Sequence, residues 1–331
     1  MEKIVVAGPF NPKMIKALEK EILSEYFKII YIDSSEQYNE FEDASYIILR
    51  TLAIGRETIE KMGRVKLIQR WGAGFDTVDI KAAGEMGIQV AVTAGMNATP
   101  VAELSVALAL AVYRNIVPLT YGIMNGKWER EEYCRRSYTL NGKIVGVYGI
   151  GSIGQKTAAL YRAFGADVIY YDLRPLSPEI ETSLGVVCVK KKELWRRSDI
   201  ITLHAPLTDE TRNCINSETI GMMKDGVVLI NTAREELCDM AAVAKALESG
   251  RMLGAGFDAL EEDFVSRNPF AGMDNVVLSP HLGGNTIDNV EHMARRCAEQ
   301  IRLVSGGSVL KAPHLVNGEF LKGKSGDGGE G

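Results

Sequence analysis

Short apolar runs alternate with stretches whose apolar positions recur at helical spacing along most of this 331-residue chain. The short runs are typical of buried strands, and the longer stretches are typical of helices that cover them. The predicted strands are 4–7, 27–32, 46–49, 67–71, 89–91, 144–148, 168–171, 186–189, 200–204, 227–231, 253–257 and 276–278. The predicted helices include 12–24, 57–62, 78–86, 240–249 and 285–304. Strands that alternate with helices in this way predict the α/β class, with parallel sheets covered by helices.

A long helical pattern, 99–125, separates the strands of the first hundred residues from those that follow. Thr99 can cap its start, and Pro100 suits a first helical turn. Pro118 should kink or split the helix, because proline lacks an amide hydrogen and clashes with the preceding turn. A long apolar helix between two α/β units usually packs between domains or against a second subunit.

Residues 143–172 carry the strongest functional signal. The apolar run 144–148 leads directly into the loop GIGSIG, and a helical pattern then continues to Gly165. A second apolar run ends on Asp172, eighteen residues after the last glycine of the loop. This order predicts a dinucleotide-binding βαβ unit, whose loop approaches a pyrophosphate at the helix N-terminus. The predicted cofactor contacts here are Gly149, Gly151, Ser152, Ile153, Gly154 and Asp172.

Asp172 bears on the choice of cofactor. Its carboxylate can accept hydrogen bonds from the hydroxyls of the adenosine ribose, and it repels the extra phosphate of NADP. Arg174 lies two residues later and partly offsets that repulsion. The sequence therefore favours NAD, with NADP as the less favoured cofactor.

Composition and charge narrow the class of protein. The chain is 46% hydrophobic and 24% charged, with a net charge of −5, which is typical of a globular protein in solution. No basic block predicts binding to nucleic acid or to an anionic membrane, and no apolar stretch approaches the ~20 residues of a membrane span. The five cysteines are scattered and lack CxxC spacing, so we expect reduced thiols in the cytoplasm and no metal site. The glycine-rich tail after Lys322 is typical of disorder.

Reactive side chains follow predicted strands in the second half of the chain. Arg234, His281 and an acidic group, Asp258 with 261–263, each come just after one of these strands. Ligands of doubly wound sheets bind at the carboxyl ends of the strands, so we expect these groups to face the dinucleotide. Arginine can hold a carboxylate, histidine can exchange a proton near neutral pH, and a neighbouring carboxylate can fix the histidine ring. The set suits hydride transfer to a carbonyl.

These motifs together resemble the D-isomer-specific 2-hydroxyacid dehydrogenases, the family of phosphoglycerate, D-lactate and glyoxylate/hydroxypyruvate reducing enzymes. The resemblance covers roughly residues 1–317. The segments that carry it are WGAGFDTVD (71–79), NATPVAEL (97–104), HAPLTDET (204–211), INTAREELCD (230–239), GAGFDALEED (254–263) and SPHLGGNT (279–286). It implies a Rossmann cofactor domain, 99–284, inserted into a flavodoxin-like substrate domain made of 1–98 and 285–331. It also implies a homodimer that forms through the 99–125 region.

The resemblance implies roles for single residues. Arg234 would bind the substrate carboxylate and carbonyl, His281 would be the acid/base, and Asp263 would pair with it. Asp258 would hold the nicotinamide carboxamide. The other implied cofactor contacts are His204, Pro206, Thr211, Thr232, Ala233 and Gly283, with Arg234 and His281 also beside the cofactor. The implied substrate contacts besides Arg234 and His281 are Arg50, Ala73, Gly74 and Asn97.

Three positions depart from the family pattern. The acid that pairs with the histidine is usually glutamate, whereas Asp263 is one methylene shorter; the adjacent Glu261 and Glu262 can substitute if the loop shifts. Glu235 replaces the glycine that usually follows the arginine. Arg50 stands alone where the phosphoglycerate branch tends to carry two arginines, which weakens the case for a phosphorylated substrate.

We therefore expect an NAD-dependent oxidoreductase that interconverts a small 2-keto acid and its D-2-hydroxy acid. A phosphoglycerate-type dehydrogenase is an alternative within this class. An NAD(H)-sensing scaffold on the same fold is an alternative outside it, although the set of Arg234, Asp263 and His281 argues against a protein without catalysis. Formate-dehydrogenase-like chemistry is disfavoured, because it needs no proton transfer.

Overall fold

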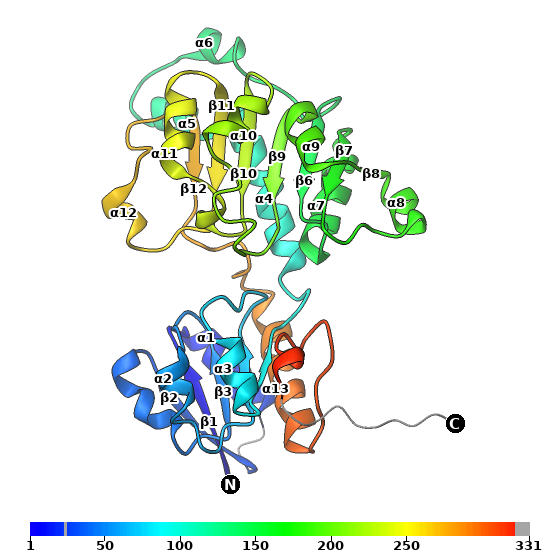
Figure 1. The fold of residues 1–331 in the computed structure, drawn as a ribbon. Coiled ribbons are helices and arrows are strands. Elements are labelled where there is room, and N and C mark those ends of the chain that lie inside the picture. The colour runs from blue at the N-terminus through cyan, green and yellow to red at the C-terminus, as the bar shows by residue number, and fades with distance from the viewer. Residues whose placement is uncertain (23–24, 322–331) are drawn as a thin grey trace. The chain divides into compact units, whose positions relative to one another are not determined.

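A computed structural model describes residues 1–22 and 25–321, and this part of the chain forms two compact units (Figure 1). Unit 1 combines Met1–Asn97 with the described part of Asn285–Gly331, and unit 2 is Ala98–Gly284. Unit 2 is thus inserted into the sequence of unit 1. The prediction of disorder for the tail after Lys322 lies outside the described residues.

Among its described residues, unit 1 is built on a five-stranded sheet in the order β2-β1-β3-β4-β5. All neighbouring strands pair in parallel, and this is the flavodoxin-like order of doubly wound folds. The strands are β1 (Glu2–Ala7), β2 (Phe27–Ile32), β3 (Tyr46–Leu49), β4 (Leu67–Arg70) and β5 (Gln89–Ala91). Their apolar runs are nearly continuous because helices bury both faces of the sheet.

Helices cover the two faces of this sheet separately. Ile4 and Val6 of β1 belong to a core that α1 and α13 complete on one face. Val5 and Ala7 point the other way, into a core that η1, α2 and α3 complete. Asn11 begins α1 by accepting a hydrogen bond from the amide of Met14 at 3.0 Å. The helical elements are α1 (Pro12–Glu21), η1 (Ser35–Phe41), α2 (Arg56–Ile59), α3 (Ile80–Glu85), α13 (Val290–Ser305) and η3 (Gly318–Phe320).

After α13 the chain returns to the β5 edge of the sheet. The amide of Val316 donates to the carbonyl of Val90 at 3.0 Å. The side chain of Asn317 accepts from the Val90 amide at 2.8 Å and donates to the Ile88 carbonyl at 2.9 Å. Asn317 is fully buried, so this segment covers an edge that would otherwise expose unpaired backbone groups.

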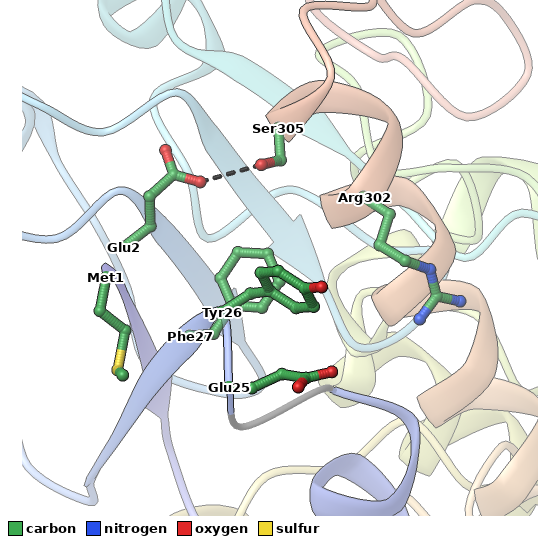
Figure 2. A pocket seen from close by; sticks show the side chains of 7 residues that line it. All are labelled: Met1, Glu2, Glu25, Tyr26, Phe27, Arg302 and Ser305. Atoms are coloured by element: carbon green, nitrogen blue, oxygen red, sulfur yellow. Dashed lines mark hydrogen bonds between the residues drawn. The ribbon is translucent and has the colours of Figure 1, made fainter.

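A pocket opens at the amino ends of β1 and β2, beside the last turn of α13 (Figure 2). The hydroxyl of Ser305 contacts the carboxylate of Glu2 across it at 2.9 Å. The pocket is lined by Met1, Glu2, Glu25, Tyr26, Phe27, Arg302 and Ser305. Doubly wound sheets bind their ligands at the opposite, carboxyl edge, so this pocket is separate from the candidate site.

The described part of unit 2 contains a seven-stranded parallel sheet in the order β12-β11-β10-β9-β6-β7-β8. Counted from β6, the first six strands follow the Rossmann order 3-2-1-4-5-6, and β12 extends the sheet beyond β11. The two sheets confirm the predicted fold class. The strands are β6 (Ile144–Tyr148), β7 (Asp167–Tyr171), β8 (Val186–Cys188), β9 (Ile200–Leu203), β10 (Val227–Asn231), β11 (Met252–Phe257) and β12 (Val276–Leu278).

The helices of unit 2 also form two layers. On one side α4 packs against α7 and against β10 and β11. On the other side the core includes Trp195 of α9, Ile220 of α10 and Val243 of α11. Asp239 caps α11, as predicted, by accepting from the Ala242 amide at 3.1 Å. The helical elements are α4 (Ala98–Tyr113), α5 (Ile116–Met124), α6 (Arg130–Cys134), α7 (Ser152–Ala163), α8 (Pro178–Leu184), α9 (Lys191–Arg197), α10 (Ser217–Met222), η2 (Glu235–Leu237), α11 (Met240–Glu248) and α12 (Phe264–Arg267).

The predicted helix 99–125 is two helices, α4 and α5, separated by a 61° bend. The break falls at Asn115, whose φ is 53°, three residues before Pro118, so the predicted split is confirmed. Pro118 lies in the first turn of α5, because in a continuous helix its ring would clash with the carbonyl one turn earlier. In the part of the chain that the structure describes, no single helix is long and apolar enough to cross a membrane; the bent pair α4 and α5 reaches that length and composition only when taken together.

Other helix boundaries also differ from prediction. The helices predicted over 57–62 and 78–86 are the shorter α2 and α3, and Thr99 lies inside α4 and does not cap it. The helix predicted from 285 begins at Val290, and neither Asn285 nor Thr286 caps it; Asn289 precedes it without a side-chain cap bond. The helix predicted over 12–24 ends at Glu21, and the last two residues of that prediction lie outside the described part.

The contact between α3 and η3 generates a test of the fold. A Cβ on Gly84 would lie 2.4 Å from the Cβ of Phe320 and 2.8 Å from its carbonyl oxygen. Gly84→Ala should therefore lower the free energy of unfolding by about 1–3 kcal/mol, despite the better helix propensity of alanine. Gly221→Ala is the matched control, since a Cβ there meets no atom within 4 Å. Urea unfolding that finds the two variants equally stable would contradict the described packing of η3.

Candidate functional site

The glycine loop lies at the carboxyl end of β6, where its close contacts require glycine. Gly149 has a φ of 96°, and a Cβ on it would lie 2.6 Å from the amide nitrogen of Ala205. A Cβ on Gly154 would lie 2.1 Å from the carbonyl oxygen of Gly149, so only glycine lets α7 pack this closely on the loop. A Cβ on Gly151 would meet no atom within 4 Å, which leaves open space in front of α7.

This geometry fits the pyrophosphate of a dinucleotide. Ser152 and Ile153 are the first residues of α7, a helix of 12 residues. The N–H groups of a first helical turn lack intrahelical partners and lie at the positive end of the helix dipole. An anion in the open space before Gly151 would therefore meet donors on the helix side.

Asp172 is held beside this loop at the end of β7. One of its carboxylate oxygens accepts from the Ile150 amide at 2.7 Å, and the other accepts from the Arg174 amide at 2.9 Å. The carboxylate is thus oriented by backbone groups, and each oxygen keeps further acceptor capacity for a ribose hydroxyl.

Further predicted cofactor contacts follow β9 and β10 at the same edge of the sheet. Burial lowers the pKa of His204 to about 3, so its ring is neutral at physiological pH. The ring also lies 2.8 Å from the hydroxyl of Thr202. The Thr211 hydroxyl donates to the Pro206 carbonyl at 2.7 Å, which fixes the loop after β9. Thr232 and Ala233 directly follow β10.

Arg234 leads from β10 into η2. Its backbone is extended, with φ −145°, and its carbonyl accepts from the side chain of the fully buried Asn231 at 2.7 Å. The guanidinium donates to the Ala233 carbonyl at 2.6 Å. The half-buried side chain is near enough to Glu261 to help lower the pKa of that carboxyl group.

His281 stands in a turn that Asp258 holds in place. The carbonyl oxygen of Asp258 accepts from the His281 amide at 2.7 Å, and its carboxylate oxygens accept from the amides of Leu282 and Gly283 at 2.8 Å each. Asp258 is 2% exposed, and His281 has a φ of 54°, in the left-handed region. A Cβ on Gly283 would lie 2.8 Å from the Asp258 carboxylate, so glycine is needed there.

The carboxylate that contacts His281 is Glu261. Its Oε1 lies 3.0 Å from Nδ1 of the imidazole. This hydrogen bond is the main reason that the pKa of Glu261 is lowered; Arg234 adds to the effect. The pairing of Asp263 with His281, which the sequence predicted, is therefore not the contact found. Asp263 begins α12, and its carboxylate meets the guanidinium of Arg267, four residues later, at 3.1 Å.

Arg267 was missed by the sequence reasoning. It also forms two hydrogen bonds to Glu235, one of them 2.8 Å long from Nη2 to Oε2. The four-residue spacing from Asp263 to Arg267 is the one signal that indicated this pair, since such positions are neighbours on a helix.

The predicted substrate contacts Arg50, Ala73, Gly74 and Asn97 all belong to unit 1. Arg50 follows β3, and its guanidinium donates to the Pro9 carbonyl. The loop after β4 carries Ala73 and Gly74, and the Gly74 carbonyl accepts from Arg70 at 2.9 Å. Arg50, Ala73 and Gly74 thus follow strands at the carboxyl edge of the unit 1 sheet, while Arg234 and His281 belong to unit 2.

The described residues contain no group of three or more His, Cys, Asp or Glu side chains that could hold a metal ion. All five cysteines are described as free thiols, and Cys214, Cys238 and Cys297 are buried.

Comparison with known proteins identifies the family. The NAD-binding domain of the D-isomer specific 2-hydroxyacid dehydrogenases matches residues 106–283, more than half of the chain. The D-3-phosphoglycerate dehydrogenase of Methanocaldococcus jannaschii is 37% identical over 96% of this chain, which spans only 60% of that enzyme's length. The hydroxypyruvate reductase of Thermotoga maritima is 36% identical, with 86% of this chain and 90% of that enzyme covered.

The fold agrees with these matches. The crystal structure of a glyoxylate reductase from Paecilomyes thermophila resembles this chain with a TM-score of 0.83 and 27% identity, covering 94% of this chain and 98% of that one. The matched domain, the glycine loop and Asp172 together support NAD as the cofactor. The chain therefore belongs to the D-isomer specific 2-hydroxyacid dehydrogenases, and unit 2 contains the NAD-binding domain of that family.

Proposed function

We propose that this protein interconverts a small 2-keto acid and its D-2-hydroxy acid with NAD(H). The observation that carries the proposal is the placement of Arg234 and the His281–Glu261 pair. They follow three adjacent strands, β10, β11 and β12, at the edge of the sheet that also carries the NAD-binding loop. The relatives named for phosphoglycerate, hydroxypyruvate and glyoxylate all act on acids of this kind.

Each side chain of the proposed site has a separate role in reduction of the ketone. NADH supplies the hydride when bound. Arg234 binds the substrate carboxylate and stabilises the negative charge that develops on the carbonyl oxygen. His281 donates the proton to that oxygen, and Asp258 fixes the turn from which the imidazole projects. Asp258 also remains the proposed acceptor for the nicotinamide carboxamide.

The remaining proposed substrate contacts are residues of unit 1. The backbone amides of Ala73 and Gly74 would bind the substrate carboxylate, with Asn97 and Arg50 as further polar contacts. A single arginine at Arg50 favours a small, unphosphorylated 2-keto acid such as glyoxylate or hydroxypyruvate. A phosphoglycerate-type substrate is the alternative within the family.

We also propose that the protein forms a homodimer through α5. Apolar side chains project into solvent along this helix and the turn after it, which is typical of an association surface. They are Ile116, Val117, Tyr121, Ile123, Met124 and Trp128, each between 49% and 82% exposed.

The free cysteines suit a reducing compartment, and we place the protein in the cytoplasm.

The central test compares two histidines in a panel of 2-keto acids, followed by NADH absorbance. His281→Gln should reduce kcat by about 100-fold or more, because it removes the proton donor. His204→Gln should change the KM for NADH and leave the shape of the pH–rate profile unaltered, since burial keeps that ring neutral. Full activity of His281→Gln would refute the mechanism. Tight NADH binding without turnover of any acid would favour an NAD(H)-sensing scaffold instead.

The cofactor preference depends on Asp172. Replacing it by serine removes the charge that repels a ribose phosphate, so the ratio of kcat/KM for NADH over NADPH should fall about tenfold, or ~1.4 kcal/mol. Arg174→Ala in the Asp172→Ser background should then weaken NADPH selectively. An unchanged ratio in Asp172→Ser would show that the preference arises elsewhere.

Dimer formation is tested by introducing negatively charged side chains on the exposed apolar surface of α5. Tyr121 and Met124 are 71% and 82% exposed, so Tyr121→Glu with Met124→Glu should leave the fold intact and convert a dimer to a monomer in sedimentation experiments. Val187→Glu alters a 58% exposed apolar residue on β8 and should leave the dimer unchanged. A wild-type monomer at micromolar concentration would contradict the proposal.

A further inference from the structure

Three consecutive acidic residues follow β11, and they have different partners. Glu261 contacts Nδ1 of His281 at 3.0 Å. Asp263 contacts Arg267 at 3.1 Å. Glu262 is exposed. The carboxylates are therefore not interchangeable, although they occupy one short loop.

Arg267 connects this loop to the residue that follows Arg234. Its guanidinium binds both carboxylate oxygens of Glu235, a bidentate arrangement that fixes orientation as well as distance. The Glu235 side chain is only 13% exposed, so the contact is partly shielded from solvent. The Nε of Arg267 donates to the carboxylate of Asp263. We call Glu235, Asp263 and Arg267 the Arg267 cluster.

The Arg267 cluster constrains the loop between Asp258 and Asp263 at its Asp263 end. Asp258 is fixed at the near end by its hydrogen bonds to the His281 turn, and Asp263 is fixed at the far end by Arg267. Glu261 lies between these two anchors and reaches the imidazole. A glycine in place of Glu235 would leave Arg267 without its bidentate partner.

The charges around His281 agree with this geometry. Arg234 from the end of β10 favours the ionised form of Glu261, whereas the nearby carboxylate of Asp263 opposes it. Arg267 compensates the charge of Asp263 directly. Asp258 faces the same turn from β11, with its carboxylate engaged by backbone amides.

We propose that Glu261 is the carboxylate that pairs with His281 in catalysis, and that Arg267 is the positioning residue that withdraws Asp263 from this role. The inference rests on the proposed keto-acid reductase function. An ionised carboxylate only accepts hydrogen bonds, so Nδ1 of His281 carries the hydrogen that Glu261 binds. Nε2 is then the atom that exchanges a proton with the substrate.

The step balances with these groups. Bound NADH would supply the hydride that C2 of the keto acid gains, and NAD would be left; the carbonyl electron pair moves to the oxygen, and that oxygen takes the proton from Nε2. The imidazolium becomes neutral imidazole, which solvent reprotonates after product leaves. Glu261 keeps its charge throughout and stabilises the protonated ring.

The experiment compares three near-isosteric variants in the wild-type chain: Glu261→Gln, Asp263→Asn and Glu262→Gln. Reduction requires the protonated ring, so loss of the paired negative charge should move the alkaline limb of the pH–rate profile to lower pH. We expect a shift of roughly one pH unit or more for Glu261→Gln. We expect none for Glu262→Gln, and a much smaller one for Asp263→Asn. A large shift in Asp263→Asn with none in Glu261→Gln would overturn the assignment.

Arg267 is tested through the same profile. Arg267→Ala leaves the charge of Asp263 uncompensated and frees that carboxylate to approach His281, so the alkaline limb should move to higher pH, opposite to the shift in Glu261→Gln. Arg267→Lys should restore part of the wild-type position, because lysine keeps the charge but not the bidentate contact. Thermal unfolding and NADH binding establish that the variants are folded. A wild-type profile in Arg267→Ala would refute the positioning role.

A readout without turnover separates this inference from the proposed function. Titration of the histidine rings by NMR, with His281 assigned through His281→Gln, reports the pairing even if no keto acid is reduced. A His281 titration midpoint that falls in Glu261→Gln, and not in Asp263→Asn, supports the pair whatever the substrate. The reverse result would overturn the pair even in an active enzyme.

Discussion

The position of the proposed acid/base depends on one buried carboxylate. Asp258 ends β11, and its carboxylate accepts hydrogen bonds from the two amides that follow His281. The left-handed backbone of His281, with φ 54°, costs about 1–2 kcal/mol for a residue with a Cβ. Each hydrogen bond to a charged acceptor contributes about 1.5–3 kcal/mol, so the two bonds outweigh the strain. The same turn sets the direction in which the imidazole leaves the sheet and meets Glu261.

Sheet order explains why residues far apart in sequence form one site. The order places β10, β11 and β12 together on one side of β9 and β6, and β7 and β8 on the other. The chain reverses direction of winding between β6 and β9, which is where doubly wound folds leave a crevice for a dinucleotide. Asp172 follows β7 on the side proposed for the adenosine, and Arg234 and His281 follow β10 and β12 on the side proposed for the reaction. The proposed cofactor site thus spans both halves of the sheet.

The sequence was sufficient to predict those features of the fold and of the site that depend on local residue patterns. Buried strands read as apolar runs, so all twelve strands described in the structure were predicted, and residues just past them were correctly placed at one sheet edge. The split of the helix predicted over 99–125 is confirmed, and it falls at Asn115 because proline disrupts the turn before it. The partner of His281 was misassigned between Glu261 and Asp263, since both lie in one loop and their side-chain directions depend on Arg267. No sequence periodicity reports that contact.

Charge balance indicates why two departures from the family pattern occur in the same chain. Glu235 and Asp263 both contact the guanidinium of Arg267, whereas Glu261 contacts His281 and is influenced by Arg234. Without Arg267, the carboxylates of Glu235 and Asp263 would lose the guanidinium that they share. Glu235, the shortened Asp263 and Arg267 therefore act as one electrostatic unit, and a change at any of the three alters the conditions for the other two.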